Sequence, residues 1–282
     1  MLEKMKNAWR IPELRKKIIY TLIMLLIYRV GSVIPTPGVN VDYIAQQVNN
    51  ISMLGMLDFI NGQNFSNFTI FAMGISPYIT SSIIMQLLTI AIPKFTDWSK
   101  EGESGQKKLS LVTRWLTVVL ALVTAVGYTL YISNSGMVQT YKSTWENVVV
   151  KIVLVACYCA GAALIMWLAE RINEFGIGNG ISIILFAGIL SRVPSMVSSM
   201  ISGLRAGTLA WWAAVLVVLG ILALIVLITW VNGAERRIPV QYAKRQVGRK
   251  MYGGQASTLP MKVNMSGVLP IIFAQSIAMI PS

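Results

Sequence analysis

The sequence has 282 residues, of which 55% are hydrophobic and only 12% are charged. Ordinary soluble domains carry about 25% charged residues, so this composition argues against one and favours a chain that places most of its surface against lipid. The chain has no histidine and only two cysteines, Cys157 and Cys159. Common zinc, haem and iron–sulfur sites therefore lack their ligands, and Ser-His or Cys-His catalytic pairs lack their histidine base. We expect neither an enzyme nor a cofactor.

Residues 1–17 are predicted to form a short amphipathic helix on an anionic membrane surface. The first hydrophobic segment follows this helix directly in the chain. Apolar and cationic residues alternate in this stretch: Leu2, Met5, Trp9 and Ile11 against Lys4, Lys6, Arg10, Arg15, Lys16 and Lys17. This pattern is typical of interfacial helices. The stretch has no small-residue cleavage site, so we do not interpret it as a cleaved signal peptide.

Seven apolar segments are long enough to cross a membrane, since about 20 helical residues span the hydrocarbon. The predicted spans are Ile18–Ile34, Phe68–Ile92, Leu109–Ile132, Val148–Leu168, Ile181–Ile201, Trp211–Val231 and Asn264–Ser282. The fifth is the weakest, because Arg192 and Pro194 interrupt it. The sequence thus predicts an all-α, multi-spanning helical bundle. We divide it into residues 18–171 with spans one to four, 172–201 with a hinge and span five, and 211–282 with spans six and seven.

The distribution of Lys and Arg predicts the orientation of these spans. With the N-terminus in the cytoplasm, 19 of the 24 cations fall in cytoplasmic segments and only Lys142, Lys151, Arg192 and Arg205 fall on the other side. Cytoplasmic loops of membrane proteins carry this excess. We therefore expect a multi-pass protein with a cytoplasmic N-terminus.

Two connections have unusual composition. Val48–Asn67, on the external side, carries apolar residues at three- and four-residue spacing, which predicts a short amphipathic helix. From the residues alone, a helix lying on the outer leaflet and a functional insertion are equally good interpretations. The glycine-rich run 176–180 has neither the Gly-Lys-Ser/Thr sequence nor the preceding strand of a phosphate-binding loop, so we interpret it as a hinge in which Asn179 caps the next helix.

The cytoplasmic segment 232–263 is long for a connection, and long ordered loops are usually functional. Glu235–Val240 is predicted to form a strand, and residues 242–250 form a dense basic tip. A merely solvated charge run and binding to anionic lipid are both compatible with this tip. A ribosome or an acidic protein surface is a further interpretation, because clustered Arg binds phosphates and carboxylates.

Several motifs resemble the SecY family of protein-conducting channel subunits. They are Ile70–Ile79 (IFAMGISPYI), Glu101–Lys108 (EGESGQKK), Met166–Glu170 (MWLAE), Gly176–Ile183 (GIGNGISI), Tyr242–Gln246 (YAKRQ) and Leu259–Val268 (LPMKVNMSGV). The resemblance is collinear from the N-terminal helix to Ser282. It implies ten spans in two pseudo-symmetric halves that form a clamshell around a pore, of which this chain would contain seven. The implied function is the translocation of unfolded secretory proteins across the bacterial plasma membrane and the lateral release of membrane proteins into it.

The resemblance also implies roles for individual residues. An aliphatic pore ring would comprise Ile75, Ile79, Ile181, Leu185 and Ile272, although Leu185 replaces the isoleucine more usual in the family. The external segment 51–66 would be a plug helix, with Leu54, Met56, Leu57, Phe59, Ile60 and Gly62 as its sealing residues. Polar residues of the lateral gate would be Gln86 and Asn264. A docking surface for the ribosome and the SecA motor would comprise Arg236, Arg237, Lys244, Arg245, Arg249 and Lys250.

The partners implied are the SecE and SecG subunits, SecA, the ribosome, signal sequences, translocating polypeptides and anionic lipids, without specific DNA binding. A secondary transporter with inverted repeats is the alternative, because such carriers also have broken helices. Carriers commonly hold ionisable residues at the membrane midplane, whereas Glu170 and Glu174 lie at a predicted cytoplasmic helix end. This placement favours the channel.

Overall fold

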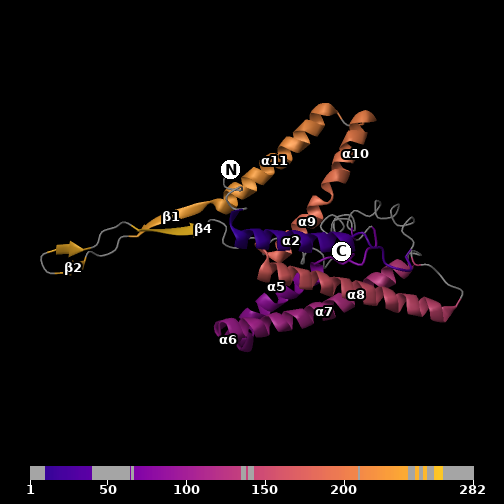
Figure 1. Cartoon of the computed structure of the whole chain (residues 1–282), viewed down its shortest axis with the longest axis horizontal. Coiled ribbons are helices and arrows are strands. Elements are labelled where there is room, and N and C mark those ends of the chain that lie inside the picture. The colour runs from indigo at the N-terminus through magenta and orange to yellow at the C-terminus, as the bar shows by residue number, and fades with distance from the viewer. Residues whose placement is uncertain are drawn as a thin grey trace. The chain divides into compact units, whose positions relative to one another are not determined.

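The computed structural model describes residues 10–39, 64, 67–134, 138, 143–208, 210–240, 245–247, 250–252 and 257–262. These residues are mostly helical, with two small antiparallel hairpins, so the predicted all-α class is confirmed (Figure 1). The chain divides into two compact units, Met1–Met196 and Val197–Ser282, and each is described by itself.

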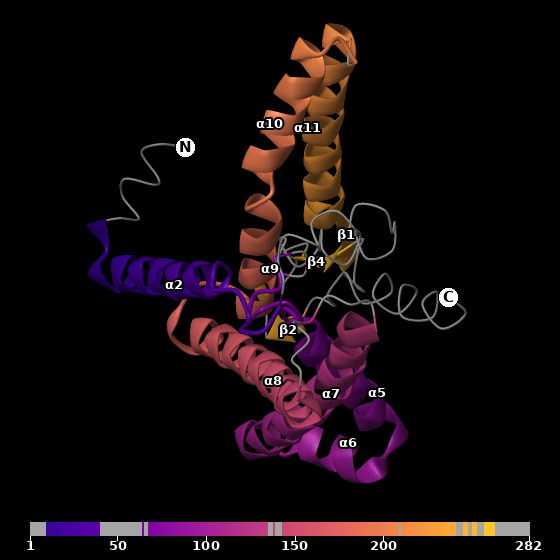
Figure 2. The same cartoon turned by 90° about the vertical axis from the view of Figure 1, so that its right-hand side faces the viewer.

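The first unit contains α2 (Pro12–Gly31), α5 (Ser76–Ala91), α6 (Pro93–Lys100), α7 (Glu103–Asn134), α8 (Thr144–Phe175) and α9 (Gly180–Leu190). Helix α10 (Val193–Arg205) begins in this unit and ends in the next. Figure 2 shows α7 beside α8, and α7 also packs along α5 and α6. Helices α2 and α9 pack against α8.

Among the described residues, four helical segments are long and apolar enough to cross a membrane: Glu103–Asn134, Thr144–Phe175, Gly180–Arg205 and the helix α11 (Trp211–Gly233) of the second unit. The bent pair α5–α6 would be a fifth. The predicted spans three, four and six therefore form continuous helices at the expected positions. The seventh lies outside the described residues.

The predicted fifth span is broken between α9 and α10, where Arg192 and Pro194 interrupt the apolar run. The predicted first span is helical in α2. That helix begins at Pro12 and continues through Lys17 without a break, so residues 12–17 of the predicted interfacial helix belong to α2.

The prediction for span two was wrong at its start and right to one residue at its end, where α5 stops at Ala91. Residues 68–74 form turns, with Phe68 at φ 45° and Gly74 at φ 58°, and the helix begins only at Ser76. At the other end Ile92 is extended because Pro93 follows it, and α6 leaves α5 at a bend of 100°. The result is a short helix of 16 residues that begins at the candidate pore ring.

In the second unit a β-ribbon follows α11. Strand β1 (Glu235–Val240) pairs antiparallel with β4 (Ser257–Lys262), and β2 (Arg245–Val247) pairs with β3 (Lys250–Tyr252). The predicted strand at Glu235–Val240 is confirmed. Its register places Glu235 opposite Lys262 at the base of the ribbon.

The first unit has two buried apolar clusters. One lies where α7 and α8 meet the turn after residue 67, and it contains Val39, Phe68, Ala72, Ala125, Ile132, Leu154 and Tyr158. Stacked rings extend it, since the Phe68 and Tyr128 centroids are 5.6 Å apart. The other cluster contains the candidate site.

Candidate functional site

The second buried cluster, here called the junction cluster, lies where α2, α5, α8 and α9 meet. Its buried members are Met24, Tyr28, Phe71, Ile75, Ile165, Leu168, Ala169, Ile172 and Ile184. Ile75 is only 3% exposed, while Ile79, Ile181 and Leu185 are partly buried against the cluster. Four of the five predicted pore-ring residues are therefore brought together, and Ile272 lies outside the described residues.

The start of α5 positions two of these side chains. Ile75 is the N-cap residue of α5, and its carbonyl accepts hydrogen bonds from the backbone N–H groups of Tyr78 and Ile79, each at 3.1 Å. Pro77 occupies the first helical turn, where its missing N–H costs nothing. Because Ile75 and Ile79 are four residues apart, they share one face of the helix.

The start of α9 positions Ile181 and Leu185. The side-chain oxygen of Asn179 accepts hydrogen bonds from the N–H groups of Ile181 at 3.0 Å and Ser182 at 3.4 Å, so the predicted helix cap is confirmed. The Asn173 side-chain oxygen accepts the N–H of Gly180 at 2.7 Å. These bonds satisfy the N–H groups that every helix start leaves free.

Glycines allow the helices around the junction cluster to approach closely. A Cβ on Gly180 would lie 2.1 Å from the carbonyl oxygen of Ala169 on α8. A Cβ on Gly161 of α8 would lie 2.1 Å from the carbonyl oxygen of Ile70, in the turn that leads into α5. Both distances are far below van der Waals contact. Any larger residue would therefore displace the starts of the two ring-bearing helices.

Backbone pairing joins residues 34–36 to residues 68–70 and so closes the loop that contains segment 51–66. The carbonyl of Phe68 accepts hydrogen bonds from both the N–H and the hydroxyl of Thr36, at 2.8 and 2.7 Å. The N–H of Ile70 donates to Ile34 at 3.2 Å, and Pro35 forms an isolated bridge with Thr69.

Asn64 ties this segment to the junction cluster. It is 1% exposed, and its side-chain amide donates a hydrogen bond of 3.1 Å to the hydroxyl of Tyr28. The Tyr28 ring in turn stacks on Phe71, with centroids 5.8 Å apart. The predicted plug residues Leu54, Met56, Leu57, Phe59, Ile60 and Gly62 lie outside the described residues.

The other predicted site residues are more scattered. Gln86 is exposed on α5, and Asn264 lies outside the described residues. Arg236 and Arg237 are exposed on β1. In the outer part of the ribbon, Arg245 belongs to β2 and Lys250 to β3, while Lys244 and Arg249 lie outside the described part.

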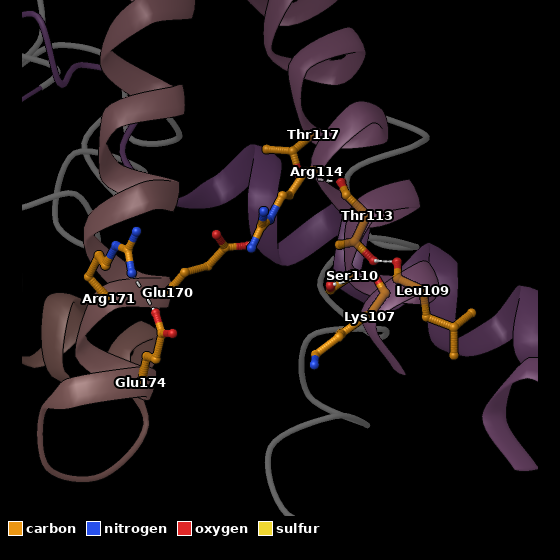
Figure 3. A network of polar contacts seen from close by, with 9 residues as sticks. All are labelled: Lys107, Leu109, Ser110, Thr113, Arg114, Thr117, Glu170, Arg171 and Glu174. Carbon is orange, nitrogen blue, oxygen red and sulfur yellow. Dashed lines mark hydrogen bonds and ion pairs between the residues drawn. The ribbon is translucent and has the colours of Figure 1, made fainter. Parts of the chain in front are cut away.

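An ion pair that we did not predict from the sequence joins α7 to α8. Arg114 Nε donates to Glu170 Oε1 at 2.8 Å, and Figure 3 shows the two side chains reaching toward each other from their helices. Arg171 instead points to Glu174 of its own helix, at 2.6 Å. Both glutamates were noted in the sequence, but their partners depend on helix packing. Among the described residues, no three acidic, cysteine or histidine side chains form a group that could hold a metal ion.

Comparison with known proteins identifies the family. The SecY family model matches residues 69–282. Over 289 residues the chain is 43% identical to the protein translocase subunit SecY of Halalkalibacterium halodurans, and over 293 residues 40% identical to that of Mycobacterium bovis. These alignments cover the whole chain and 66% and 65% of the two relatives. The chain therefore spans slightly less than two thirds of their length.

Solved structures with a similar fold support the same assignment. One is a protein-conducting channel, with a TM-score of 0.63 at 17% identity over 93% of this chain and 56% of that chain. Another is Sec61 in the canine ribosome–channel complex, with a TM-score of 0.55 at 17% identity over 80% of this chain and 49% of the other. These structures show that the fold is similar, and the family model together with the relatives shows that the chain belongs to the SecY family.

Proposed function

We propose that this chain forms most of the central subunit of a protein-conducting channel in the bacterial plasma membrane, with its N-terminus in the cytoplasm. The channel translocates unfolded secretory proteins and releases membrane proteins laterally into the lipid. The observation that supports this proposal most directly is the junction cluster. It gathers Ile75, Ile79, Ile181 and Leu185 from the first turns of two separate helices.

Aliphatic side chains suit the closed state of such a pore. A narrow apolar constriction excludes water and ions by dewetting. Ile and Leu side chains also make no directional bonds, so they can yield around a passing polypeptide of any sequence. Together with Ile272, the four clustered residues would form the constriction.

The external segment 51–66 is proposed as the plug that closes this constriction from outside. One of the solved relatives is a SecY protein whose plug domain stabilises the closed state of its translocation channel and maintains a membrane seal, with a TM-score of 0.60 at 18% identity. In the present chain, the pairing of Thr36 with Phe68 closes the loop that contains this segment, eight residues before the start of α5 at Ser76. Gln86 and Asn264 are proposed as polar residues of a lateral gate for signal sequences.

The β-ribbon is proposed as the docking site for the ribosome and SecA. Arg236 and Arg237 are exposed on β1, and more cations follow toward the ribbon tip. The energy for transport would come from these partners. SecE and SecG are proposed to complete the channel, and anionic lipids to contact its cytoplasmic surface.

A stalled secretory chain tests the channel directly. A photo-crosslinker is placed at successive positions of a translocation intermediate that is held in the full-length protein containing this chain. The proposal expects crosslinks to Ile79, Ile181 and Leu185. Crosslinks confined to the exposed face of α5, for example at Ile90, would refute it.

A second experiment tests the seal. Replacing Ile75, Ile79 and Ile181 together by serine should make the closed full-length channel conduct ions in planar bilayers. Replacing Leu87 and Ile90, which are 49% and 83% exposed on the same helix, by serine is the matched control. Equal conductance of the two variants would remove the pore-ring assignment.

The docking proposal has its own test. Replacing Arg249 and Lys250 by glutamate should weaken the binding of SecA and of ribosomes to membranes that contain the full-length protein. Replacing Lys94 and Lys100 on α6 by glutamate controls for a general loss of positive charge. Unchanged binding of the ribbon variant would show that its charges are merely solvated.

A further inference from the structure

A long apolar groove runs between α7 and α8, outside the junction cluster. Its volume is about 630 Å³, within the range of small-molecule binding sites. Its lining consists of Leu122, Val126, Thr129 and Leu130 from α7, and of Val148, Lys151, Ile152, Val155, Ala156, Cys159, Ala160 and Ala163 from α8. Lys151 is the single charged residue among them.

The polar groups of the groove lie at one end. Thr129 is five residues before the end of α7 at Asn134, and Lys151 is seven residues after the start of α8 at Thr144. Because α7 and α8 run antiparallel, these positions lie at similar depth. From there the apolar lining continues to Ala163, which is about 18 Å from Lys151 along α8 at 1.5 Å per residue. That length exceeds the half-thickness of a bilayer's hydrocarbon core, about 15 Å.

Both polar groups lack partners within the described residues. No described carboxylate forms an ion pair with Lys151. The hydroxyl of Thr129, a residue 2% exposed, makes no hydrogen bond to any described group. That oxygen has almost no accessible surface, so it lies beneath the groove lining and leaves Lys151 as the polar group that a ligand in the groove can reach.

The groove is open toward the membrane. Leu122, Leu130 and Ile152 on its rim are 50%, 51% and 62% exposed. Trp145 lies six residues before Lys151 and is 74% exposed, as expected for a tryptophan at the headgroup level. Since six helical residues rise about 9 Å, the long side chain of Lys151 can reach from the groove toward the lipid phosphates.

We propose that this groove is a binding site for an anionic phospholipid. One acyl chain lies along the apolar lining between α7 and α8, and the phosphate pairs with Lys151. The occupant is a lipid because the groove has one cation at one end and an apolar lining beyond it, in the order of a headgroup and an acyl chain. The proposed orientation places this lipid in the outer leaflet, and the site itself does not depend on the pore.

A photoactivatable phosphatidylglycerol tests the site. The full-length protein is placed in bilayer nanodiscs with phosphatidylglycerol that carries a diazirine in the middle of one acyl chain, and crosslinked peptides are identified by mass spectrometry. We expect labelling of residues 122–130 and 152–163. Phosphatidylcholine with the same diazirine should label these residues about five-fold less, because one cation near a membrane contributes about 1 kcal/mol to binding of anionic lipid.

Variants distinguish the contribution of the Lys151 charge from that of the apolar groove. Lys151→Gln should lower labelling by phosphatidylglycerol about five-fold, whereas Lys151→Arg should keep it. Ala160→Trp should block labelling by either lipid without unfolding the protein, because Ala160 is exposed and the indole fills the groove from its open side. Arg205→Gln, at an exposed cation on another helix, is the control for general attraction.

Three outcomes would overturn the proposal. Equal labelling by the two lipids, together with no effect of Lys151→Gln, would show that the groove does not select charge. Labelling outside both helices would place the lipid elsewhere. Crosslinks from the groove to another protein subunit in place of lipid would show that a protein helix occupies it.

Discussion

The contact between Gly161 and the Ile70 carbonyl predicts a large effect for a small substitution. In Gly161→Ala the new methyl group would start 2.1 Å from the Ile70 oxygen and 2.9 Å from its carbon. Ordinary contact needs more than 3 Å, so α8 or the turn before α5 must move by about 1 Å. Overpacking of this kind costs about 1–3 kcal/mol, and a backbone obstacle favours the upper end because it cannot rotate away.

Gly127→Ala is a matched control for this variant. Gly127 lies within α7, as Gly161 lies within α8, but a Cβ there would meet nothing within 4 Å. Both substitutions gain the same helix propensity, about 0.5–1 kcal/mol. The difference between the two variants therefore reports the packing cost alone.

The assay is unfolding of the full-length protein in mixed micelles with increasing dodecyl sulfate, followed by circular dichroism. We expect Gly161→Ala to be about 1–3 kcal/mol less stable than Gly127→Ala. Because Ile75 and Ile79 follow this turn, ion leak through the closed channel should rise in the same variant. If the two variants unfold at the same dodecyl sulfate concentration, α8 does not approach the turn closely and Gly161 does not position the start of α5.

Two further pairs of substitutions test the cap of α9 and the ion pair between α7 and α8 by the same unfolding assay. Asn179→Ala should destabilise the protein by about 1 kcal/mol because α9 loses its cap, while Asn179→Asp should retain stability; equal loss in both would exclude capping. Glu170→Gln should cost up to about 1 kcal/mol because it breaks the Arg114 pair between helices, the Glu170 side chain being 20% exposed. Glu174→Gln, which breaks a pair within one helix, should cost less than about 0.5 kcal/mol, and a larger loss there would contradict this ranking.

The sequence predicted the long helices because their signal is local. Helices α7, α8 and α11 lie where the apolar runs are, and α7 and α8 extend past these runs into polar residues. The break between α9 and α10 was also predictable, since an arginine and a proline interrupt one apolar run.

Other elements depend on contacts that no local pattern reveals. The turn at 68–74 is apolar enough to be read as a helix, but Phe68 and Gly74 adopt positive φ values there and the chain pairs with residues 34–36. Strand β4 was missed because its partner lies about twenty residues away in the chain, across the ribbon. Helix α6 was read as a connection because its eight residues are polar on average.

The candidate site was likewise predictable where the signal is local and not where it depends on contacts between distant residues. Spacing alone places Ile75 with Ile79, and Ile181 with Leu185, on common helix faces. It does not bring the two pairs to one cluster, because that requires the close approaches of Gly161 and Gly180 to neighbouring backbones. The Arg114–Glu170 pair likewise joins residues 56 positions apart, and only the packing of α7 on α8 brings them together.

The bridge between Pro35 and Thr69 makes residues 36–68 a closed loop with both ends on the body of the protein. Whatever a segment of this loop binds, it can leave and return without diffusing away. A segment that is tied to the protein at both ends meets its binding site at an effective concentration set by the length of the loop. Resealing of the proposed pore would then be a unimolecular step, with a rate independent of protein concentration and of dilution in the membrane.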